Sequence, residues 1–97
     1  MERIDDSALE DRLQEVPGWH YKAERRAIER ELRFSNFVDC FAFMTRVAFL
    51  AESMNHHPEF FQCYSQLRIL LTTHDADGLS ELDIEMAKQI DAMSHVS

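Results

Sequence analysis

Apolar and polar positions in the first third of the chain follow two different periods. Residues 5–14 place Leu9 and Leu13 at helical spacing, after short polar side chains that suit a helix start. A Pro-Gly pair ends this pattern, and an aromatic stretch at residues 19–22 is a candidate for a short strand. Residues 27–34 then alternate as a strand does, with three apolar side chains on one face: Ile28, Leu32 and Phe34.

A long helix is predicted from residues 35–36 to about residue 54. Asn36 can cap it, and Asp39 suits its first turn. Its apolar side chains form two neighbouring stripes: Phe37, Phe41, Met44, Ala48 and Ala51 in one, and Phe43, Val47, Leu50 and Met54 in the other. One sheet face cannot cover so wide a surface, so we expect part of it to meet another subunit. A central helix in a small core is the alternative.

Two more strands and a last helix are predicted in the second half. Residues 59–64 and 67–73 have strand patterns, and Ser65 and Gln66 are expected to join them as a tight hairpin. Ser80, with an acidic residue three positions later, resembles the capping box of a last helix. The order α-β-β-α-β-β-α predicts an α+β fold of antiparallel hairpins with helices on one face, in one domain over residues 1–97.

Composition narrows the classes of partner. The chain has 97 residues, of which 10 are Lys or Arg and 18 are Asp or Glu, for a formal charge of −8. That charge disfavours nucleic acid and anionic membrane surfaces as partners. No signal peptide and no apolar run of the roughly 20 residues that a membrane span needs is visible, so a cytoplasmic location is expected. Cys40 and Cys63 are expected to be buried free thiols, because their spacing suits neither a metal knuckle nor a redox pair.

The stretch MNHHPEF, residues 54–60, contains the adjacent histidines His56 and His57, and His74 follows the next apolar run. A tetrahedral zinc site needs three or four ligands directed at one point, whereas neighbours in an extended chain point to opposite faces. No HExxH or CxxC pattern accompanies them, so no metal is expected. Imidazole can give and take a proton near neutral pH, which makes proton transfer the second interpretation. The third is that the histidines merely pack at strand ends.

The expected hairpin favours a cluster of these histidines. Pro58 has no N–H and biases His57 towards an extended backbone. In a tight hairpin about residues 65 and 66, position 57 pairs near position 74, since both pairs sum to 131. This register would place His57 and His74 side by side at one end of the sheet.

Two acids and one aromatic residue are candidate neighbours. Glu52 lies one helical turn before His56 and could hydrogen-bond an imidazole, or it could simply be solvated. Asp83 shares a helix face with apolar residues and therefore points inward, where it could cap the helix or join a site. Trp19 offers a large flat surface, although core packing is its ordinary role.

These residues also carry a family resemblance. Residues 43–91, FMTRVAFLAESMNHHPEFFQCYSQLRILLTTHDADGLSELDIEMAKQID, closely resemble the pterin-4a-carbinolamine dehydratases, as does GWHY at residues 18–21. The pattern Glu-x-x-x-His-His-Pro, followed by Thr-His-Asp, Gly-Leu-Ser and Asp, is long and specific. The resemblance implies a four-stranded antiparallel sheet with three helices on one face, in homodimers or homotetramers.

The resemblance implies an activity and a site as well. Its implied substrate is a 4a-hydroxytetrahydropterin, which would lose water to give a quinonoid dihydropterin without a metal or organic cofactor. The implied catalytic residues are His56, His57 and His74. The implied substrate-binding residues are Trp19, Glu52, Pro58 and Asp83. The alternative function is a protein-interaction module, such as a transcription-factor dimerisation cofactor or an assembly factor, docking through Phe43, Val47 and Leu50.

Overall fold

The computed structural model describes residues 1–96, with side chains described as far as residue 94. Its elements follow the predicted order: α1 (Asp6–Leu13), β1 (His20–Lys22), β2 (Ala27–Arg33), α2 (Phe37–Met54), β3 (Glu59–Cys63), β4 (Gln66–Leu71), the 3₁₀ helix η1 (His74–Ala76) and α3 (Glu81–Val96). The strands form one antiparallel sheet in the order β1-β2-β4-β3. The predicted fold class is confirmed, with η1 as an addition.

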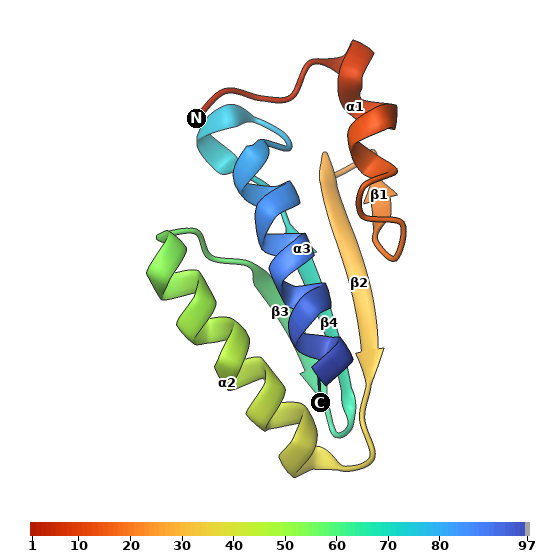
Figure 1. Cartoon of the computed structure of the whole chain (residues 1–97), viewed down its shortest axis with the longest axis vertical. Helices are drawn as coiled ribbons and strands as arrows, with labels where there is room; N and C mark the ends of the chain where they lie inside the picture. Colours follow the sequence, from red (N-terminus) through yellow and green to blue (C-terminus); the bar gives the residue numbers. More distant parts are fainter. Residues whose placement is uncertain (97) are drawn as a thin grey trace.

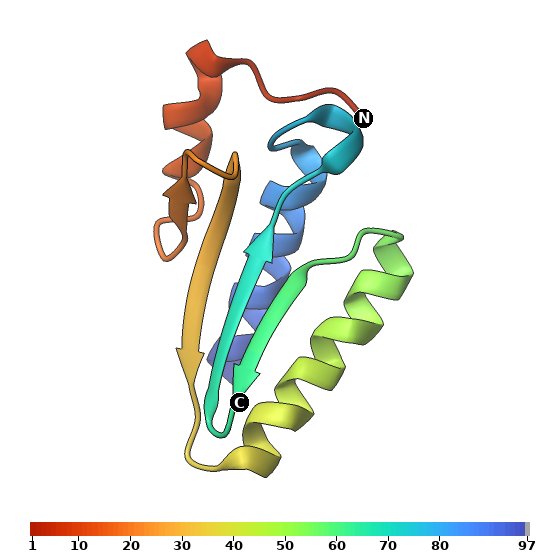
Figure 2. The same cartoon turned by 180° about the vertical axis from the view of Figure 1, so that it is seen from behind.

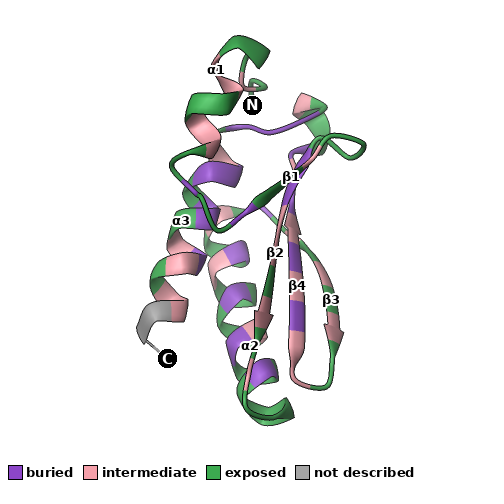
Figure 3. Cartoon of the chain, turned by 90° about the vertical axis from the view of Figure 1, so that its right-hand side faces the viewer, coloured by how far each residue is buried: buried purple, intermediate pink, exposed green. Residues whose placement is uncertain are grey.

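The helices lie on one side of the sheet. Figures 1 and 2 show α2 and α3 crossing the same face, and Figure 3 shows α1 on that side too, near β1. The core lies between the two layers, where alternate residues of β4 meet inward faces of α2 and α3 (Figure 3). The fully buried side chains include Ile28, Val47, Leu67, Ile69, Leu71, Ile84 and Ile90. Strand alternation and helical periodicity therefore place the core as the sequence predicted.

The hairpin between β3 and β4 turns one residue earlier in the chain than predicted, so each residue of β3 pairs with a residue of β4 two positions earlier than expected. Cys63 pairs with Gln66, so Tyr64 and Ser65 form the two-residue loop. Tyr64 has a φ of 52°, a left-handed conformation that two-residue hairpin turns demand. The predicted turn at Ser65 and Gln66 was therefore wrong, since no glycine or asparagine marks the true one.

The predicted pairing of His57 with His74 was wrong for the same reason. Glu59 pairs with Leu70 at the end of the ladder, and the same register extended would place His57 opposite Thr72. A shift by two residues keeps each side chain on its face, so the burial pattern of β4 still follows the prediction. His74 lies in η1, beyond the end of the strand.

The faces of α2 differ in part from the prediction. Asn36 caps the helix as expected, since its Oδ1 accepts a hydrogen bond from the Asp39 N–H at 2.8 Å. The buried residues are Cys40, Phe43, Val47 and Ala51, whereas the exposed large side chains are Phe37, Val38, Phe41 and Phe49. Phe43 and Val47 belong to the core, so the docking surface that was predicted from them was wrong.

Cys63 is a further correction, because it is an exposed free thiol at the end of β3, whereas Cys40 is buried as predicted. Alternate residues of an edge strand face away from the helices, and Cys63 belongs to that outer set with Glu59 and Phe61. None of the helices in residues 1–96 combines the length and apolar character that crossing a membrane would require.

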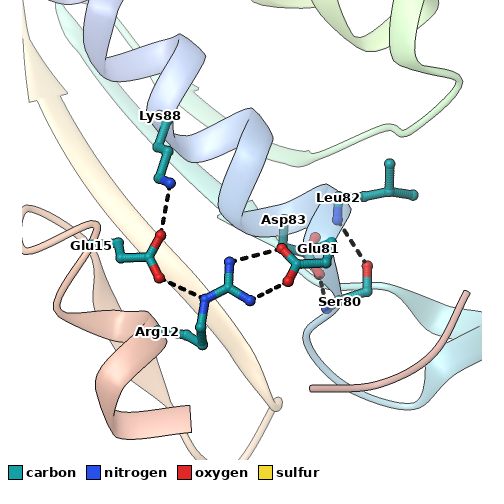
Figure 4. A network of polar contacts seen from close by, with 7 residues as sticks. All are labelled: Arg12, Glu15, Ser80, Glu81, Leu82, Asp83 and Lys88. Atoms are coloured by element: carbon teal, nitrogen blue, oxygen red, sulfur yellow. Dashed lines mark hydrogen bonds and ion pairs between the residues drawn. The ribbon is translucent and has the colours of Figure 1, made fainter. Parts of the chain in front are cut away.

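Helix α1 is tied to α3 by an ion-pair network that Figure 4 shows. The Arg12 guanidinium contacts both carboxylate oxygens of Glu81 and also donates to Glu15, while Lys88 donates to the other oxygen of Glu15. The hydrogen bond from Arg12 lowers the pKa of Glu81, and those from Lys88 and then Arg12 lower the pKa of Glu15. The network thus joins the first helix to the first turns of the last.

Candidate active site

His56 is positioned by the end of α2. Asn55 follows the last helical residue with φ 50° and ψ 43°, a left-handed conformation that stops the helix. The Asn55 N–H then bonds the Glu52 carbonyl at 3.3 Å, and the His56 N–H bonds the Ala51 carbonyl at 3.1 Å. This pair of bonds is a Schellman motif, which satisfies the last carbonyls of a helix. Its consequence is that the backbone of His56 is fixed at the edge of the core.

Asp83 is positioned by the start of α3. The Ser80 Oγ accepts from the Leu82 N–H at 3.2 Å, and the Asp83 Oδ2 accepts from the Ser80 N–H at 2.9 Å. These bonds form the predicted cap as a variant of the capping box, in which the serine accepts from the second helical residue and an aspartate replaces the usual glutamate. The Asp83 side chain is fully buried, so it points inward as its helical spacing indicated.

The two ends meet in a buried imidazole–carboxylate pair. His56 Nε2 lies 2.6 Å from Asp83 Oδ1, and His56 is only 8 % exposed. The Asp83 carboxylate also accepts from the Thr73 hydroxyl at 2.7 Å. Because Asp83 serves as an acceptor throughout, we assign the proton to His56 Nε2, which leaves Nδ1 as the basic nitrogen. Asp83 therefore caps α3 and contacts His56 at the same time, and its role in a functional site stays a prediction.

His57 faces a different acid. Its Nε2 lies 2.5 Å from Glu52 Oε2, and both side chains are largely exposed. The next residue, Pro58, is half-buried at the start of the chain segment that enters β3. The predicted proximity of Glu52 to the histidines is thus present, but its contact is with His57, not with His56.

His74 lies at the same end of the sheet as the other two histidines. It is exposed and opens η1, which follows β4, while His56 and His57 precede β3. Figures 1 and 2 show the segment after β4 and the segment before β3 at the same end of the sheet. Thr73 and Gly78 close the loop around η1 by two backbone hydrogen bonds, at 2.9 and 3.3 Å. Antiparallel pairing of β3 with β4 brings the segment before β3 and the segment after β4 to one end of the sheet, although His57 and His74 are not in direct register.

Trp19 makes its polar contact elsewhere. It is 5 % exposed, and its indole Nε1 donates to Asp91 Oδ1 at 2.9 Å. Arg30 forms an ion pair with the same oxygen from the inward face of β2. Asp91 lies about two turns along α3 from Asp83, so these contacts hold Trp19 against the later part of that helix. Its stacking role stays a prediction.

Two residues of the cluster were not predicted as site residues. Thr73 is buried and bonds both Asp83 and the Ser80 hydroxyl, each at 2.7 Å. Ser80 was predicted only as a helix start. The available signal was the inward face of the second hairpin strand, which carries Thr73 after Leu67, Ile69 and Leu71. A polar residue at the end of an apolar face needs a partner, and here the partner is Asp83.

Two other features of the described chain bear on the site. Within residues 1–96 there is no group of three or more His, Cys, Asp or Glu side chains that could hold a metal ion. A groove of about 720 Å³ lies at the opposite end of the molecule, lined by the end of β2, the first half of α2 and the last turns of α3. Since His56 follows the end of α2 and Asp83 lies at the start of α3, this groove is remote from the histidines.

Known proteins match this chain over nearly its whole length. The profile of the family described as pterin 4 alpha carbinolamine dehydratase matches residues 2–93. A relative in Burkholderia orbicola named for pterin-4-alpha-carbinolamine dehydratase is 56% identical over 80 residues, which is 82% of this chain and 78% of that protein. One in Rhizobium johnstonii with the same name is 45% identical over 91 residues, covering 94% and 90%.

Solved structures agree with this assignment. A transcriptional coactivator/pterin dehydratase from Brucella melitensis superposes with a TM-score of 0.88 at 37% identity, covering 94% of this chain and 97% of that one. A pterin dehydratase-like protein described as a RuBisCO assembly factor in the alpha-carboxysome shares the fold alone, with a TM-score of 0.67 at 20% identity, covering 77% and 87%. With the histidine pair of the HHP motif, the buried aspartate and these matches together, the chain belongs to the pterin 4 alpha carbinolamine dehydratase family.

Proposed function

We propose that this chain catalyses loss of water from a 4a-hydroxytetrahydropterin to give a quinonoid dihydropterin. Family membership supports the substrate class, and the buried contact between His56 and Asp83 is the observation that carries the chemistry. A carboxylate that accepts from Nε2–H leaves Nδ1 free to take a proton and stabilises the imidazolium that forms. Histidine acid–base chemistry of this kind is what the dehydration requires.

The reaction moves two protons and breaks the C–O bond at C4a. A proton must reach the hydroxyl oxygen on C4a as the C–O bond breaks, and water leaves. The proton on N5 must be removed, and its electrons form the C4a=N5 double bond. The substrate and product differ by one water molecule, so no oxidant or reductant takes part. A positioned acid or base typically contributes about 10²–10⁴-fold to such a step.

The environments of the histidines suggest a division of roles within this proposal. His56 would take the N5 proton, because Asp83 holds its Nε2–H and directs Nδ1 away from the acid. His74 would deliver a proton to the hydroxyl from its exposed position on η1. His57, held by Glu52, would orient the substrate. Pro58 would support the chain beside it.

The remaining expectations belong to the same proposal. Trp19 would flank the flat pterin ring. In that role one edge of the indole would contact the substrate, while the indole N–H stays bonded to Asp91. No metal or organic cofactor is assigned to the reaction, and a net charge of −8 favours neither nucleic acid nor an anionic membrane as partner. A cytoplasmic enzyme acting on a small pterin is the simplest form of this function.

The test is the dehydration rate of freshly generated 4a-hydroxytetrahydropterin, followed by absorbance with the wild type and with the double variant His56→Ala and His74→Ala. We expect the wild type to accelerate dehydration and the variant to lose at least about 10²-fold in kcat. His20→Gln is a matched control, because His20 is an exposed histidine on β1, outside the cluster. Equal rates for the double variant and this control would exclude histidine catalysis, and no acceleration by folded wild type would exclude the activity.

A second candidate function is a protein-interaction module. The observation that favours it is the row of exposed apolar side chains on α2, where Val38 and Phe49 are each 73% exposed. Patches of this kind mark protein contacts. The Brucella structure carries the name of a transcriptional coactivator as well as that of a pterin dehydratase, and the carboxysome protein is described as an assembly factor. A second copy of this chain, in a homodimer or homotetramer, is the simplest occupant.

The two functions separate experimentally. Substitution of Phe49 by Ser should alter assembly and leave the histidines in place, because Phe49 points away from the core. An unchanged dehydration rate per chain with altered assembly would assign the surface to contacts between proteins. An equal loss of both would indicate that the active site depends on assembly.

A further inference from the structure

Thr73 follows the last residue of β4, and its buried hydroxyl takes part in more hydrogen bonds than packing alone requires. It is 3% exposed, and its hydroxyl contacts two side chains, Asp83 Oδ2 at 2.7 Å and Ser80 Oγ at 2.7 Å. Both partners are fully buried. None of the buried side-chain nitrogen or oxygen atoms in the described part of the chain lacks a hydrogen-bond partner, so this cluster is fully satisfied.

The direction of each hydrogen bond follows from the partners. Asp83 accepts, so the single hydroxyl proton of Thr73 goes to Oδ2. Thr73 Oγ1 is then the acceptor in its contact with Ser80, whose hydroxyl proton it receives. Ser80 Oγ in turn accepts from the Leu82 N–H. A chain of donors therefore runs from Leu82 at the start of α3 to the carboxylate, and each link has one allowed direction.

This chain determines which oxygen of Asp83 faces His56. Oδ2 already receives two donors, the Thr73 hydroxyl and the Ser80 N–H. Oδ1 is left to the imidazole Nε2 at 2.6 Å. A carboxylate with donors from three sides cannot rotate without breaking one of them. The imidazole is thereby kept in one tautomer and one orientation.

Thr73 also adjoins the second proposed proton carrier. His74 is the next residue, and both backbone hydrogen bonds between Thr73 and Gly78 close the loop that holds it. The threonine that orients Asp83 with its side chain therefore anchors the His74 loop with its backbone.

We propose that Thr73 is a positioning residue of the active site, which fixes the Asp83 carboxylate for His56 and anchors the loop of His74. The inference rests on the proposed dehydratase function. Thr73 makes no substrate contact in this role and acts only through Asp83 and the chain geometry. Its removal should lower kcat and leave KM nearly unchanged, because substrate binding does not use its hydroxyl.

The test compares Thr73→Val, which keeps the shape and removes the hydroxyl, with Thr73→Ser, which restores it. We expect Thr73→Val to lose about tenfold or more in kcat with KM within twofold, and Thr73→Ser to recover most of the rate. The ¹⁵N chemical shifts of the His56 ring should indicate Nε2–H in the wild type and a mixture of tautomers in Thr73→Val. Thr72→Val is the matched control, because the neighbouring hydroxyl bonds the carbonyls of Arg26, at 2.9 Å, and Gly78, at 3.5 Å, and not Asp83.

Equal losses in Thr72→Val and Thr73→Val, a loss confined to KM, or unchanged His56 shifts would overturn the positioning role. Should Thr73→Val fail to fold, a slowly exchanging Thr73 hydroxyl proton with cross-peaks to Asp83 in wild-type NMR would support it, and a rapidly exchanging one would overturn it. A wild type that does not dehydrate the pterin would reject the proposed function, while the ring shifts still test the positioning of His56.

Discussion

His56 Nε2 and Asp83 Oδ1 lie 2.6 Å apart across 27 positions of sequence, and each residue sits at the end of a different helix. A Schellman motif at the end of α2 fixes the histidine, and a capping box at the start of α3 fixes the aspartate. The C-terminal motif of α2 and the N-terminal cap of α3 thus place an imidazole and a carboxylate in contact with each other in the protein interior. The two central residues of the candidate site therefore belong to the segments that end α2 and begin α3.

Replacement of Asp83 by Asn tests whether the contact with His56 requires the negative charge of the carboxylate. The amide NH₂ would face Nε2–H, or the imidazole would change tautomer and lose its free Nδ1. We expect kcat to fall by about 10²-fold or more. The free energy of unfolding should fall by about 1–3 kcal/mol, since the buried donors lose a charged acceptor.

The control for this substitution is Glu85→Gln on the exposed face of the same helix. The Glu85 carboxylate accepts a hydrogen bond from the Gln89 side chain on the exposed face of α3. Its substitution should leave the rate unchanged and the free energy of unfolding within about 0.5 kcal/mol of the wild type. A full rate for Asp83→Asn would contradict the role of the carboxylate. The measurements are steady-state dehydration kinetics and urea unfolding followed by circular dichroism.

Local signals in the sequence predicted much of this arrangement. Asn36 and the capping box at Ser80 start their helices where expected, since each depends on one polar side chain and nearby N–H groups. The hairpin register was missed because Tyr64 adopts a left-handed conformation that its residue type does not announce. The contact of Thr73 with Asp83 was missed as well, because it depends on the packing of β4 against α3.

Asn55 provides a prediction on backbone conformation. Its φ of 50° suits Gly best and Asn next, whereas a β-branched residue is strained there. We expect Asn55→Gly to retain the stability and rate of the wild type, and Asn55→Val to cost about 1–2 kcal/mol and to reduce kcat by displacing His56.

Ser53→Val is the reference for the Asn55 variants. Ser53 is exposed within α2, where valine costs only a few tenths of a kcal/mol. Urea unfolding of the three variants separates backbone strain from helix propensity. Equal destabilisation by Val at positions 53 and 55 would show that the left-handed residue does not control the helix end.

The Arg12 network predicts a dependence of stability on pH. The pKa of Glu81 is lowered from 4.5 by Arg12, and that of Glu15 by Lys88 and then Arg12. Because the folded pKa values lie below the unfolded ones, these pairs stabilise the fold above about pH 5 and lose that contribution as the pH falls through the folded values. Arg12→Gln should therefore be less stable than wild type at pH 7, and the difference should shrink at about pH 2.5.

The size of this effect is modest, because the Glu81 side chain is 63% exposed. For the pair of Arg12 and Glu81 we expect about 1 kcal/mol or less after screening by solvent. Arg33→Gln is the control, since Arg33 pairs with Glu31 on the exposed face of β2, away from the helices. Urea unfolding at both pH values measures the difference. A gap between wild type and Arg12→Gln that stayed constant with pH would reject the ionic origin.

The two faces of α2 give the last prediction. Phe43 is 2% exposed and Phe49 is 73% exposed, although both are phenylalanines of one helix. Phe43→Ala should cost about 3–5 kcal/mol of unfolding free energy, because it opens a cavity between α2 and the sheet. Phe49→Ser should change the stability of an isolated chain by less than about 0.5 kcal/mol.

Phe49→Ser should instead weaken self-association, which sedimentation velocity measures over a range of protein concentrations. An apolar side chain this exposed gains free energy only when another surface covers it, so its removal should shift the population towards smaller species. Phe49→Leu is the matched variant, because it keeps an apolar group at the same position and should retain assembly. Identical sedimentation profiles for Phe49→Ser, Phe49→Leu and the wild type would show that this face does not mediate self-association. A partner other than a second copy of the chain would then have to cover it.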